Sequence, residues 1–292
     1  MSDFIQLLVS GLATGAIYAL AALGFTLLWQ TSQTINFAQG EFVMVPAFFV
    51  LAATKLFGAS FPVAIAFGIV ASVIVFGFLF KRAVVDPMLK HGVLPLVIST
   101  IALSIVLKEG VKEFYSAQAE PFPAIWTSSD LHVLGVVISV QNLAIIAIAV
   151  CLVAGLSLFL NFTQVGRCMQ ATAQNRVVAQ ILGINIERMV LYTFIINAVL
   201  IAVASILISP IYLAKFSNGE TLGLSAFIAA IIGGFNQVRG AIVGGLVLGV
   251  VENMSAAYIS AAYRGAFPMI LLILVILFMP QGLLGRREER TV

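Results

Sequence analysis

Two stretches of this chain place polar or charged side chains inside otherwise apolar sequence, and these are the residues that could do chemistry. The first holds Asn36, Gln39 and Glu41 at the start of an apolar run. The second holds Glu252 and Asn253, well inside a later apolar run. An ionisable group within a membrane segment costs a few kcal/mol, so such groups are mostly functional or paired. All five side chains are therefore candidates for the lining of a translocation pathway.

Each stretch also has a purely structural interpretation. Asn36 is suited to cap a helix that starts at the cytoplasmic surface, and Glu41 would be favoured near the positive end of that helix dipole. Glu252 would serve as a hydrogen-bond partner for another helix, as polar transmembrane residues commonly do. The sequence leaves the structural and the pathway interpretations open for both stretches.

A third polar stretch runs from Gly233 to Gly240 and separates two apolar runs. It contains Asn236, Gln237 and Arg239 between glycines. This composition is expected of broken helices that line a cavity, so we count these three residues as further pathway candidates. A plain cytoplasmic loop is the alternative.

The chain lacks the side-chain combinations that enzymes use. No GxxxxGK[ST] sequence occurs, and His91 and His132 have no Cys or second His at ligand spacing. Cys151 and Cys168 are too few and too differently placed to suggest a metal site or a disulfide. We therefore expect no catalytic residue, no metal and no cofactor bound by this chain, and any ATP hydrolysis must take place on another subunit.

The elements that must position these residues are membrane helices. Of 292 residues, 61% are hydrophobic and only 9% are charged, whereas a soluble domain carries about 25% charged residues. The apolar runs are continuous rather than alternating, which excludes a membrane β-barrel. The sequence predicts an all-α polytopic integral membrane protein with about 8–10 transmembrane helices, one of them short or broken.

Nine apolar runs count as candidate crossings. The seventh is too short to cross straight as a helix, and it could be a half-helix that enters the membrane and turns back. They cover residues 5–29, 42–57, 61–80, 93–110, 139–160, 189–209, 223–235, 240–262 and 266–280.

Basic residues orient these runs through the positive-inside rule. Three short segments hold most of them: Lys81, Arg82 and Lys90; Arg167, Arg176 and Arg188; Arg286, Arg287 and Arg290. With these in the cytoplasm, the N-terminus lies outside and the C-terminus inside. Residues 112–132, acidic and proline-rich, then form an outer loop.

The loop of residues 161–188 carries an amphipathic pattern. Met169, Ala173, Val177 and Ile181 recur at every fourth position, while Arg176 and Gln180 are polar. The pattern predicts a short amphipathic helix on the cytoplasmic side, which would dock on a partner or lie on lipid.

Several glycine pairs have GxxxG spacing, which lets helix backbones approach closely in lipid. The pairs are Gly11 with Gly15, Gly240 with Gly244, and Gly245 with Gly249. We expect close helix packing at these positions.

Dispersed motifs along almost the whole chain resemble the branched-chain amino-acid ABC transporter permease family, in particular its LivH-type subunits. They are Gly11–Leu20, Asn36–Glu41, Gly183–Asn185, Gly233-Gly234 with Gly240–Gly245, and the ending Met279–Arg287.

The resemblance implies a single permease domain over residues 1–292 in the bacterial cytoplasmic (inner) membrane. It implies four kinds of partner: a second homologous permease, two cytoplasmic ABC ATPases, an extracytoplasmic solute-binding protein and the lipid bilayer. It places ATPase coupling in loop 161–188, at Arg167, Met169, Ala173, Arg176, Val177, Ala179, Ile181 and Gly183. Nucleic acid is not expected as a partner.

The leading hypothesis is therefore ATP-driven import of branched-chain amino acids or related small polar solutes. Gln39, Asn175 and residues 236–239 depart from the usual family pattern, so urea, short amides and aromatic or other carboxylates stay open as substrates. A stand-alone secondary transporter or channel, with Glu41 or Glu252 in a proton relay, is the alternative.

Overall fold

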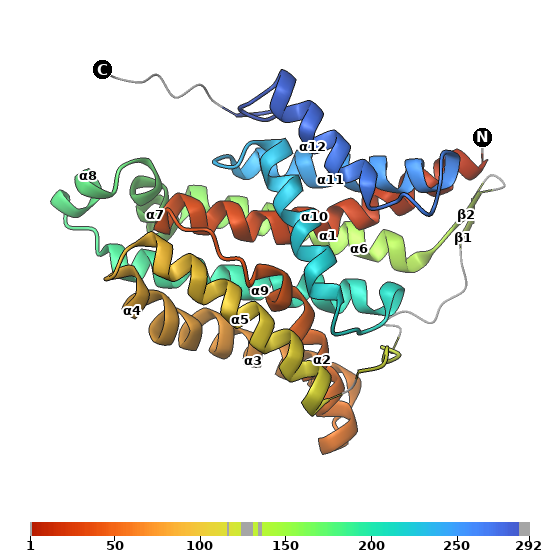
Figure 1. Ribbon diagram of the computed structural model, residues 1–292, viewed down its shortest axis with the longest axis horizontal. Helices are drawn as coiled ribbons and strands as arrows, with labels where there is room; N and C mark the ends of the chain where they lie inside the picture. The colour runs from red at the N-terminus through yellow and green to blue at the C-terminus, as the bar shows by residue number, and fades with distance from the viewer. Residues whose placement is uncertain (1, 116, 124–130, 134–135, 286–292) are drawn as a thin grey trace. The chain divides into compact units, whose positions relative to one another are not determined.

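The apolar runs of the sequence form helices, as the computed structural model shows (Figure 1). The structure describes residues 2–115, 117–123, 131–133 and 136–285. The elements are α1 (Ser2–Ser32), α2 (Gln39–Phe57), α3 (Phe61–Ser72), the π-helical segments η1 (Val73–Leu79) and η2 (Lys81–Val85), α4 (Asp86–Leu89), α5 (Val93–Phe114), β1 (Leu131–Val133), β2 (Val136–Ile138), α6 (Val140–Phe162), α7 (Gln164–Gln174), α8 (Arg176–Ile181), α9 (Ile186–Tyr212), α10 (Asn218–Gly233), α11 (Val238–Tyr258) and α12 (Ala266–Phe278).

The prediction of an all-α polytopic membrane protein is confirmed. Each of the nine predicted runs coincides for most of its length with helical structure. Among the residues that the structure describes, seven helical segments are long and apolar enough to cross a membrane. The seventh run is α10, which has 16 residues and is about 24 Å long at 1.5 Å per residue. That length falls short of a hydrocarbon core of about 30 Å, so a short segment is present where it was expected. The last helix, α12, is also short, with 13 residues.

The region between α5 and α6 contains a small hairpin that the sequence did not predict. Strands β1 and β2 pair antiparallel, with Leu131 opposite Ile138. The preceding segment is tied to the link between α9 and α10, because Glu120 and Ala214 exchange two backbone hydrogen bonds of 2.9 Å. Trp126 and Asp130 of the expected outer loop lie outside the described residues, as do Arg286, Arg287 and Arg290.

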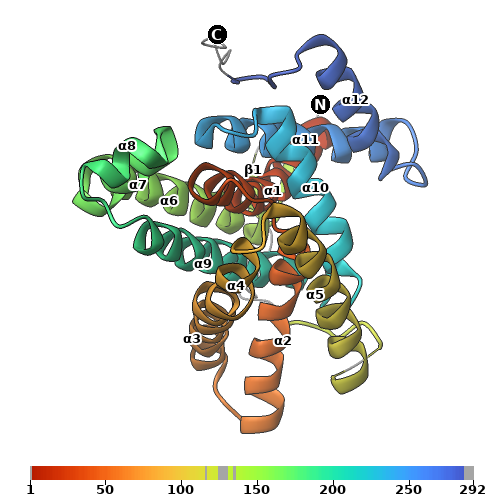
Figure 2. The same cartoon turned by 60° about the vertical axis from the view of Figure 1, so that its left-hand side comes forward.

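Packing divides the chain into two compact units. Unit 1 comprises Met1–Thr26, Ile125–Val150 and Ser225–Val292, and unit 2 comprises Leu27–Ala124 and Cys151–Leu224. The boundaries fall within α1, α6 and α10. In unit 2, α2 packs along α3 and α9, and Figures 1 and 2 both show α2 beside α3.

Helices α1 and α11 of unit 1 pack through the predicted glycine pairs. A Cβ atom added at Gly15 would lie 2.8 Å from the Gly245 carbonyl oxygen, and one at Gly11 would lie 2.9 Å from the Val250 Cα. From the other side, a Cβ at Gly249 would meet the backbone of Gly15. Because only glycine leaves room for these contacts, the expectation of close packing is confirmed.

The core of unit 2 depends on aromatic rings and on a second set of glycines. Phe42 of α2 is stacked on Phe76 at 4.2 Å between ring centroids and meets Phe80 edge to face at 4.8 Å. Nearby, Gly40 lies against the backbone of Gly219 and Gly223. The start of α2 is therefore packed tightly against the start of α10.

Replacing Gly249 by Ala should lower the thermal stability of the detergent-solubilised chain. The added methyl group meets the Gly15 backbone, and overpacking of this kind costs about 1–3 kcal/mol. Gly155→Ala is the matched control, because a Cβ at that helical glycine has nothing within 4 Å. Equal melting temperatures for the two variants would contradict the close contact of α1 and α11.

Candidate translocation site

The turn between α1 and α2 buries three of the predicted pathway residues. Asn36, Gln39 and Glu41 expose 5%, 0% and 4% of their surface. The Asn36 side-chain oxygen accepts a 3.0 Å hydrogen bond from the Ala38 amide, and the Phe37 amide donates to Thr100 Oγ1 of α5 at 3.2 Å. Helix α2 begins with Ala38 as its N-cap. The interpretation of Asn36 as the N-cap of a helix at the membrane surface is therefore wrong, since the turn folds into the protein.

Two hydrogen bonds attach this turn to the middle of α9. Gln39 Nε2 donates to Asn197 Oδ1 at 2.7 Å, and Asn197 Nδ2 donates back to Gln39 Oε1 at 3.0 Å. Asn197 is 1% exposed and lies near the centre of a helix that runs from Ile186 to Tyr212. Because α9 is long enough to cross the bilayer, the turn lies near mid-depth of that span.

Glu41 contacts the middle of a second helix, α5. The Ser104 hydroxyl hydrogen-bonds to its side chain, and Lys108 and Glu220 are close enough to interact with it electrostatically. Lys108 Nζ and Glu220 Oε2 form a 2.8 Å ion pair. Since Thr100, Ser104 and Lys108 recur at every fourth residue, one polar face of α5 follows the turn.

One polar atom in this turn has no partner among the described residues. Asn36 Nδ2 is buried and makes no hydrogen bond. Most buried polar atoms in folded proteins are hydrogen-bonded, so an exception calls for an explanation. The role of Asn36 in binding a polar solute therefore stays a prediction.

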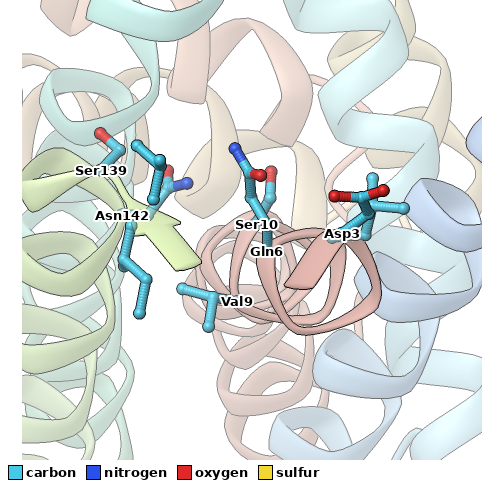
Figure 3. A pocket seen from close by; sticks show the side chains of 9 residues that line it. Asp3, Gln6, Val9, Ser10, Ser139 and Asn142 are labelled. Atoms are coloured by element: carbon cyan, nitrogen blue, oxygen red, sulfur yellow. The ribbon is translucent and has the colours of Figure 1, made fainter. Parts of the chain in front are cut away.

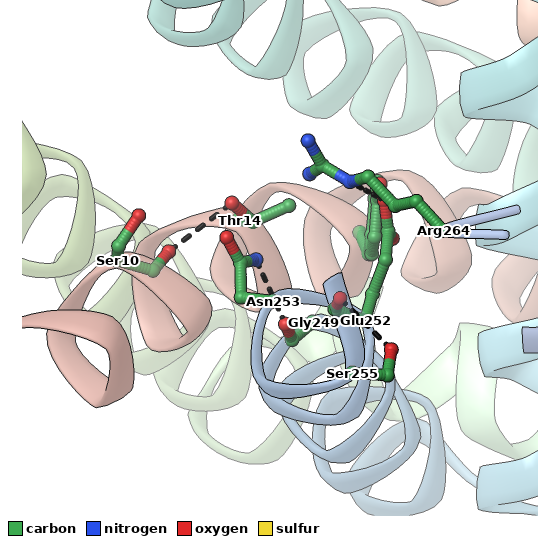
Figure 4. Close-up of polar contacts among 8 residues, drawn as sticks. Ser10, Thr14, Gly249, Glu252, Asn253, Ser255 and Arg264 are labelled. Carbon is green, nitrogen blue, oxygen red and sulfur yellow. Dashed lines mark hydrogen bonds and ion pairs between the residues drawn. The ribbon is translucent and has the colours of Figure 1, made fainter. Parts of the chain in front are cut away.

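Unit 1 holds the second carboxylate, Glu252, which the structure supplies with two partners. Tyr18 donates its hydroxyl to Glu252 Oε2 at 2.7 Å. Arg264 Nε contacts Glu252 Oε1, also at 2.7 Å, and Figure 4 shows Arg264 beside Glu252. Glu252 is 7% exposed. The carboxylate thus has a cationic partner on the segment after α11, which fits the structural interpretation of this residue. Its neighbour Asn253 donates to the Gly249 carbonyl of its own helix at 2.9 Å.

The turn between α10 and α11 carries the remaining pathway candidates. Asn236 and Arg239 are exposed, and Gln237 is the half-exposed N-cap of α11. Gly233 lies against Gly240 across this turn. This arrangement matches the loop alternative, so the role of these three residues in a pathway stays a prediction.

The ending Met279–Gly285 returns to the last turn of α10. The Leu283 and Leu284 amides donate to the Ile232 and Gly233 carbonyl oxygens at 2.8 and 3.0 Å. Gly282 also approaches the Gly234 backbone closely. The C-terminal motif therefore covers carbonyl groups that α10 leaves unpaired at its end.

The coupling segment forms two short helices rather than the single amphipathic helix that we expected. Asn175 has an extended backbone, with φ −157° and ψ 106°, and its side chain accepts a 3.0 Å bond from the Val178 amide. It therefore ends α7 and caps α8. As a result the four-residue repeat is split: Met169 is buried, whereas Val177 and Ile181 are 67% and 79% exposed.

The other predicted coupling residues differ in exposure. Arg167 and Gly183 are exposed, Ala173 and Arg176 are half-exposed, and Ala179 is buried. Gly183 has φ +82°, a backbone conformation that favours glycine at a helix C-terminus. Ala179 is thus a packing position, and Gly183 is a position at which the helix ends.

A cavity of about 410 Å³ with both polar and apolar lining residues lies in unit 1, between the start of α1 and the start of α6 (Figure 3). Asp3, Gln6 and Ser10 line one wall, and Ser139 and Asn142 line the other. The sequence did not indicate this cavity, because Val137 and Ile138, which complete its second wall, belong to the unpredicted hairpin.

Sequence reasoning also missed the partners of the predicted residues. These are Asn197, Ser104, Lys108, Glu220, Tyr18 and Arg264. The signal for the first three was available, since polar residues within apolar runs must find partners. Nothing local showed which residues they would meet.

A bundle of apolar helices with buried polar groups at mid-span defines a polytopic membrane transport protein. The family model described as branched-chain amino acid transport system / permease component matches residues 7–276. The chain therefore belongs to that family, and it is a transport permease component rather than an enzyme.

Relatives in other organisms match over nearly their full length. The chain is 32% identical to the high-affinity branched-chain amino acid transport system permease protein LivH of Salmonella typhimurium and 34% identical to BraD of Pseudomonas aeruginosa. In both cases 99% of this chain and 98% of the relative are covered. A probable LivH of Methanocaldococcus jannaschii is 27% identical over 92% of this chain and 89% of its own.

A solved structure shares the fold. PsaBC from Streptococcus pneumoniae in complex with Fab matches with a TM-score of 0.51 and 12% identity, covering 95% of this chain and 92% of that one. At this identity the likeness supports the fold alone.

Replacing Gln39 by Leu should destabilise the chain, because Asn197 keeps a buried amide without its partner, at a cost of about 1–3 kcal/mol. The double variant Gln39→Leu/Asn197→Leu should recover most of that loss, since both polar groups are then removed. Thermal unfolding in detergent measures this cycle. Additive losses in the double variant would show that the two amides do not hold each other.

Proposed function

We propose that this chain is the membrane-spanning subunit of an ATP-driven importer of branched-chain amino acids or related small polar solutes. The observation that carries the proposal is the buried turn Asn36–Glu41 at the middle of α9 and α5. Polar groups in the middle of a membrane span cost free energy, so they are mostly paired or line a solute pathway. Here Gln39 is paired, whereas Asn36 Nδ2 has no partner among the described residues.

The solute class follows from these groups and from the names of the relatives. An unpaired amide donor and the Glu41, Lys108 and Glu220 charges offer hydrogen bonds and both signs of charge. A zwitterionic amino acid presents one ammonium and one carboxylate group, which such a mixture can match. Urea, short amides and other carboxylates would use only part of it.

The partners in this proposal are a second permease, two cytoplasmic ATPases that use the ATP, and an extracytoplasmic binding protein. Helix α8 supports the ATPase contact. It exposes the apolar side chains of Val177, Val178 and Ile181. Exposed apolar side chains on a short helix favour docking into a groove of another protein.

The membrane orientation is part of the proposal. The chain lies in the bacterial cytoplasmic membrane with its N-terminus outside and its C-terminus inside, as the basic segments indicate. Helices α7 and α8 then face the cytoplasm. The cavity at Asp3 and Asn142 faces outward, where a binding protein would release its solute.

Reconstitution in proteoliposomes tests the proposal directly. The chain is incorporated with and without the ATPases and second permease of its own gene cluster, and uptake of labelled leucine from the binding protein is measured. Uptake is expected only with ATP and all subunits. Uptake by this chain alone would instead establish a secondary transporter or channel. Uptake of urea but not of leucine would show that the solute is not a branched-chain amino acid.

The coupling contact has its own test. Val177→Ser and Ile181→Ser should reduce co-purification of the ATPase, because burial of such a side chain is worth about 1.5–3 kcal/mol. The fold should not change, since both side chains are exposed. Leu56→Ser, at an exposed apolar position of α2, is the control. These variants are sharper than a bulky replacement of Gly183, whose positive φ would strain the helix end. Unchanged ATPase binding would rule out α8 as the docking helix.

A further inference from the structure

A basic cavity of about 780 Å³ lies in unit 2. It is separate from the buried turn Asn36–Glu41, which we call the polar turn. The walls of the cavity are η2 and α4 on one side, and the first residues of α8 and α9 on the other. Its charged lining consists of Lys81, Arg82, Lys90, Arg176, Asp86 and Glu187. Four cations thus face two carboxylates, which leaves the cavity positively charged.

The pairing within the cavity increases this imbalance locally. Lys81 Nζ contacts Asp86 Oδ2 at 2.9 Å, and Lys81 is only 8% exposed. Among the residues that the structure describes, this is the one ion pair in the lining. Arg176 makes a long 3.4 Å hydrogen bond to the Ser32 carbonyl, a neutral acceptor. The cations at Arg82, Lys90 and Arg176 are therefore balanced only by Glu187.

The cavity lies where apolar helical surface ends. Phe78 and Leu79 immediately precede the first cations and are 48% and 50% exposed. Val93 and Leu94 follow the last cation by a few residues and are 54% and 70% exposed. Basic side chains at the end of an exposed apolar helix surface occupy the level of lipid headgroups.

We propose that this basic cavity binds the phosphate headgroup of an anionic phospholipid in the cytoplasmic leaflet. Arginine and lysine supply charge-assisted hydrogen bonds to phosphate oxygens. Basic pockets between membrane helices on the cytoplasmic side bind anionic headgroups in this manner. The apolar residues beside the cavity accommodate the acyl chains, which favours a lipid over a soluble phosphate compound.

Binding at this place would act on the coupling segment. Arg176 is the first residue of α8, and Arg82 belongs to η2. A phosphate held by both would tie α8 to the helix that precedes α4. The proposal is independent of the transported solute, because none of these residues belongs to the polar turn.

Lipid binding to the full-length chain, purified in detergent, provides the test. Native mass spectrometry measures the affinity for phosphatidylglycerol, phosphatidylcholine and glycerol 3-phosphate. We expect phosphatidylglycerol to bind at least tenfold more tightly than the other two. Removing one charge, in Arg82→Gln, should weaken it about fivefold, and Arg82→Gln/Lys90→Gln about 25-fold.

Two controls separate this site from general surface charge. Arg188→Gln removes a cation that is exposed and lies outside the cavity, and it should change the affinity less than twofold. Arg82→Lys keeps the charge and should keep most of the binding, which also guards against loss of folding as the cause.

Three outcomes would overturn the proposal. Equal phosphatidylglycerol affinity of the double variant and the unmodified chain would show that the cavity is not the site. Binding of glycerol 3-phosphate as tight as that of the lipid would identify a soluble phosphate compound as the ligand. If the double variant binds the lipid unchanged but no longer co-purifies with the ATPase, the cavity binds an acidic segment of a partner protein instead.

Discussion

The reciprocal hydrogen bonds between Gln39 and Asn197 are the interaction on which unit 2 depends. A chain that leaves the helical state at membrane depth exposes backbone and amide groups that lipid cannot satisfy. The turn between α1 and α2 is possible at mid-span because α9 and α5 supply partners for it. Once the turn is held there, α2 starts inside the protein, and its Glu41 meets Ser104 rather than lipid.

Close backbone packing makes room for these polar contacts. In unit 2, glycines at 40, 219 and 223 bring the starts of α2 and α10 together. In unit 1, glycines on α1 and α11 do the same and place Tyr18 within reach of Glu252. Lipid provides no hydrophobic force between helices, so small residues and interhelical hydrogen bonds carry the association. The same glycines therefore serve both packing and the placement of charge.

Some buried charged residues of this chain have an oppositely charged partner, whereas, in the part of the chain that the structure describes, some groups at two sites do not. Glu252 and Lys81 are buried, and each has an opposite charge within 3 Å, at Arg264 and Asp86. Burial without such a partner would cost several kcal/mol. In the turn Asn36–Glu41 and in the basic cavity, by contrast, some polar or charged groups have no matching partner nearby among the described residues. A ligand can bind to such unmatched groups.

The amino-acid sequence by itself determined the class of the protein and the positions of the nine apolar helical segments found in the described part of the chain. Span length and continuous apolar character are local properties, so they can be read from a window of about 20 residues. Glycine spacing likewise predicted close helix packing, although not that α1 and α11 would be the partners. The helix bounds were less exact, since α11 ends at Tyr258 rather than at residue 262.

Only the tertiary structure decided which polar residues meet. Gln39 and Asn197 are 158 residues apart in the chain, and no local pattern joins them. The same holds for Glu252 with Tyr18, and for the basic cavity with its walls from η2 and α8. The break at Asn175 turned a predicted apolar stripe into one buried and one exposed part, because a single side-chain cap outweighed the four-residue repeat. Pairing and exposure depend on contacts between distant segments, and those are set by packing.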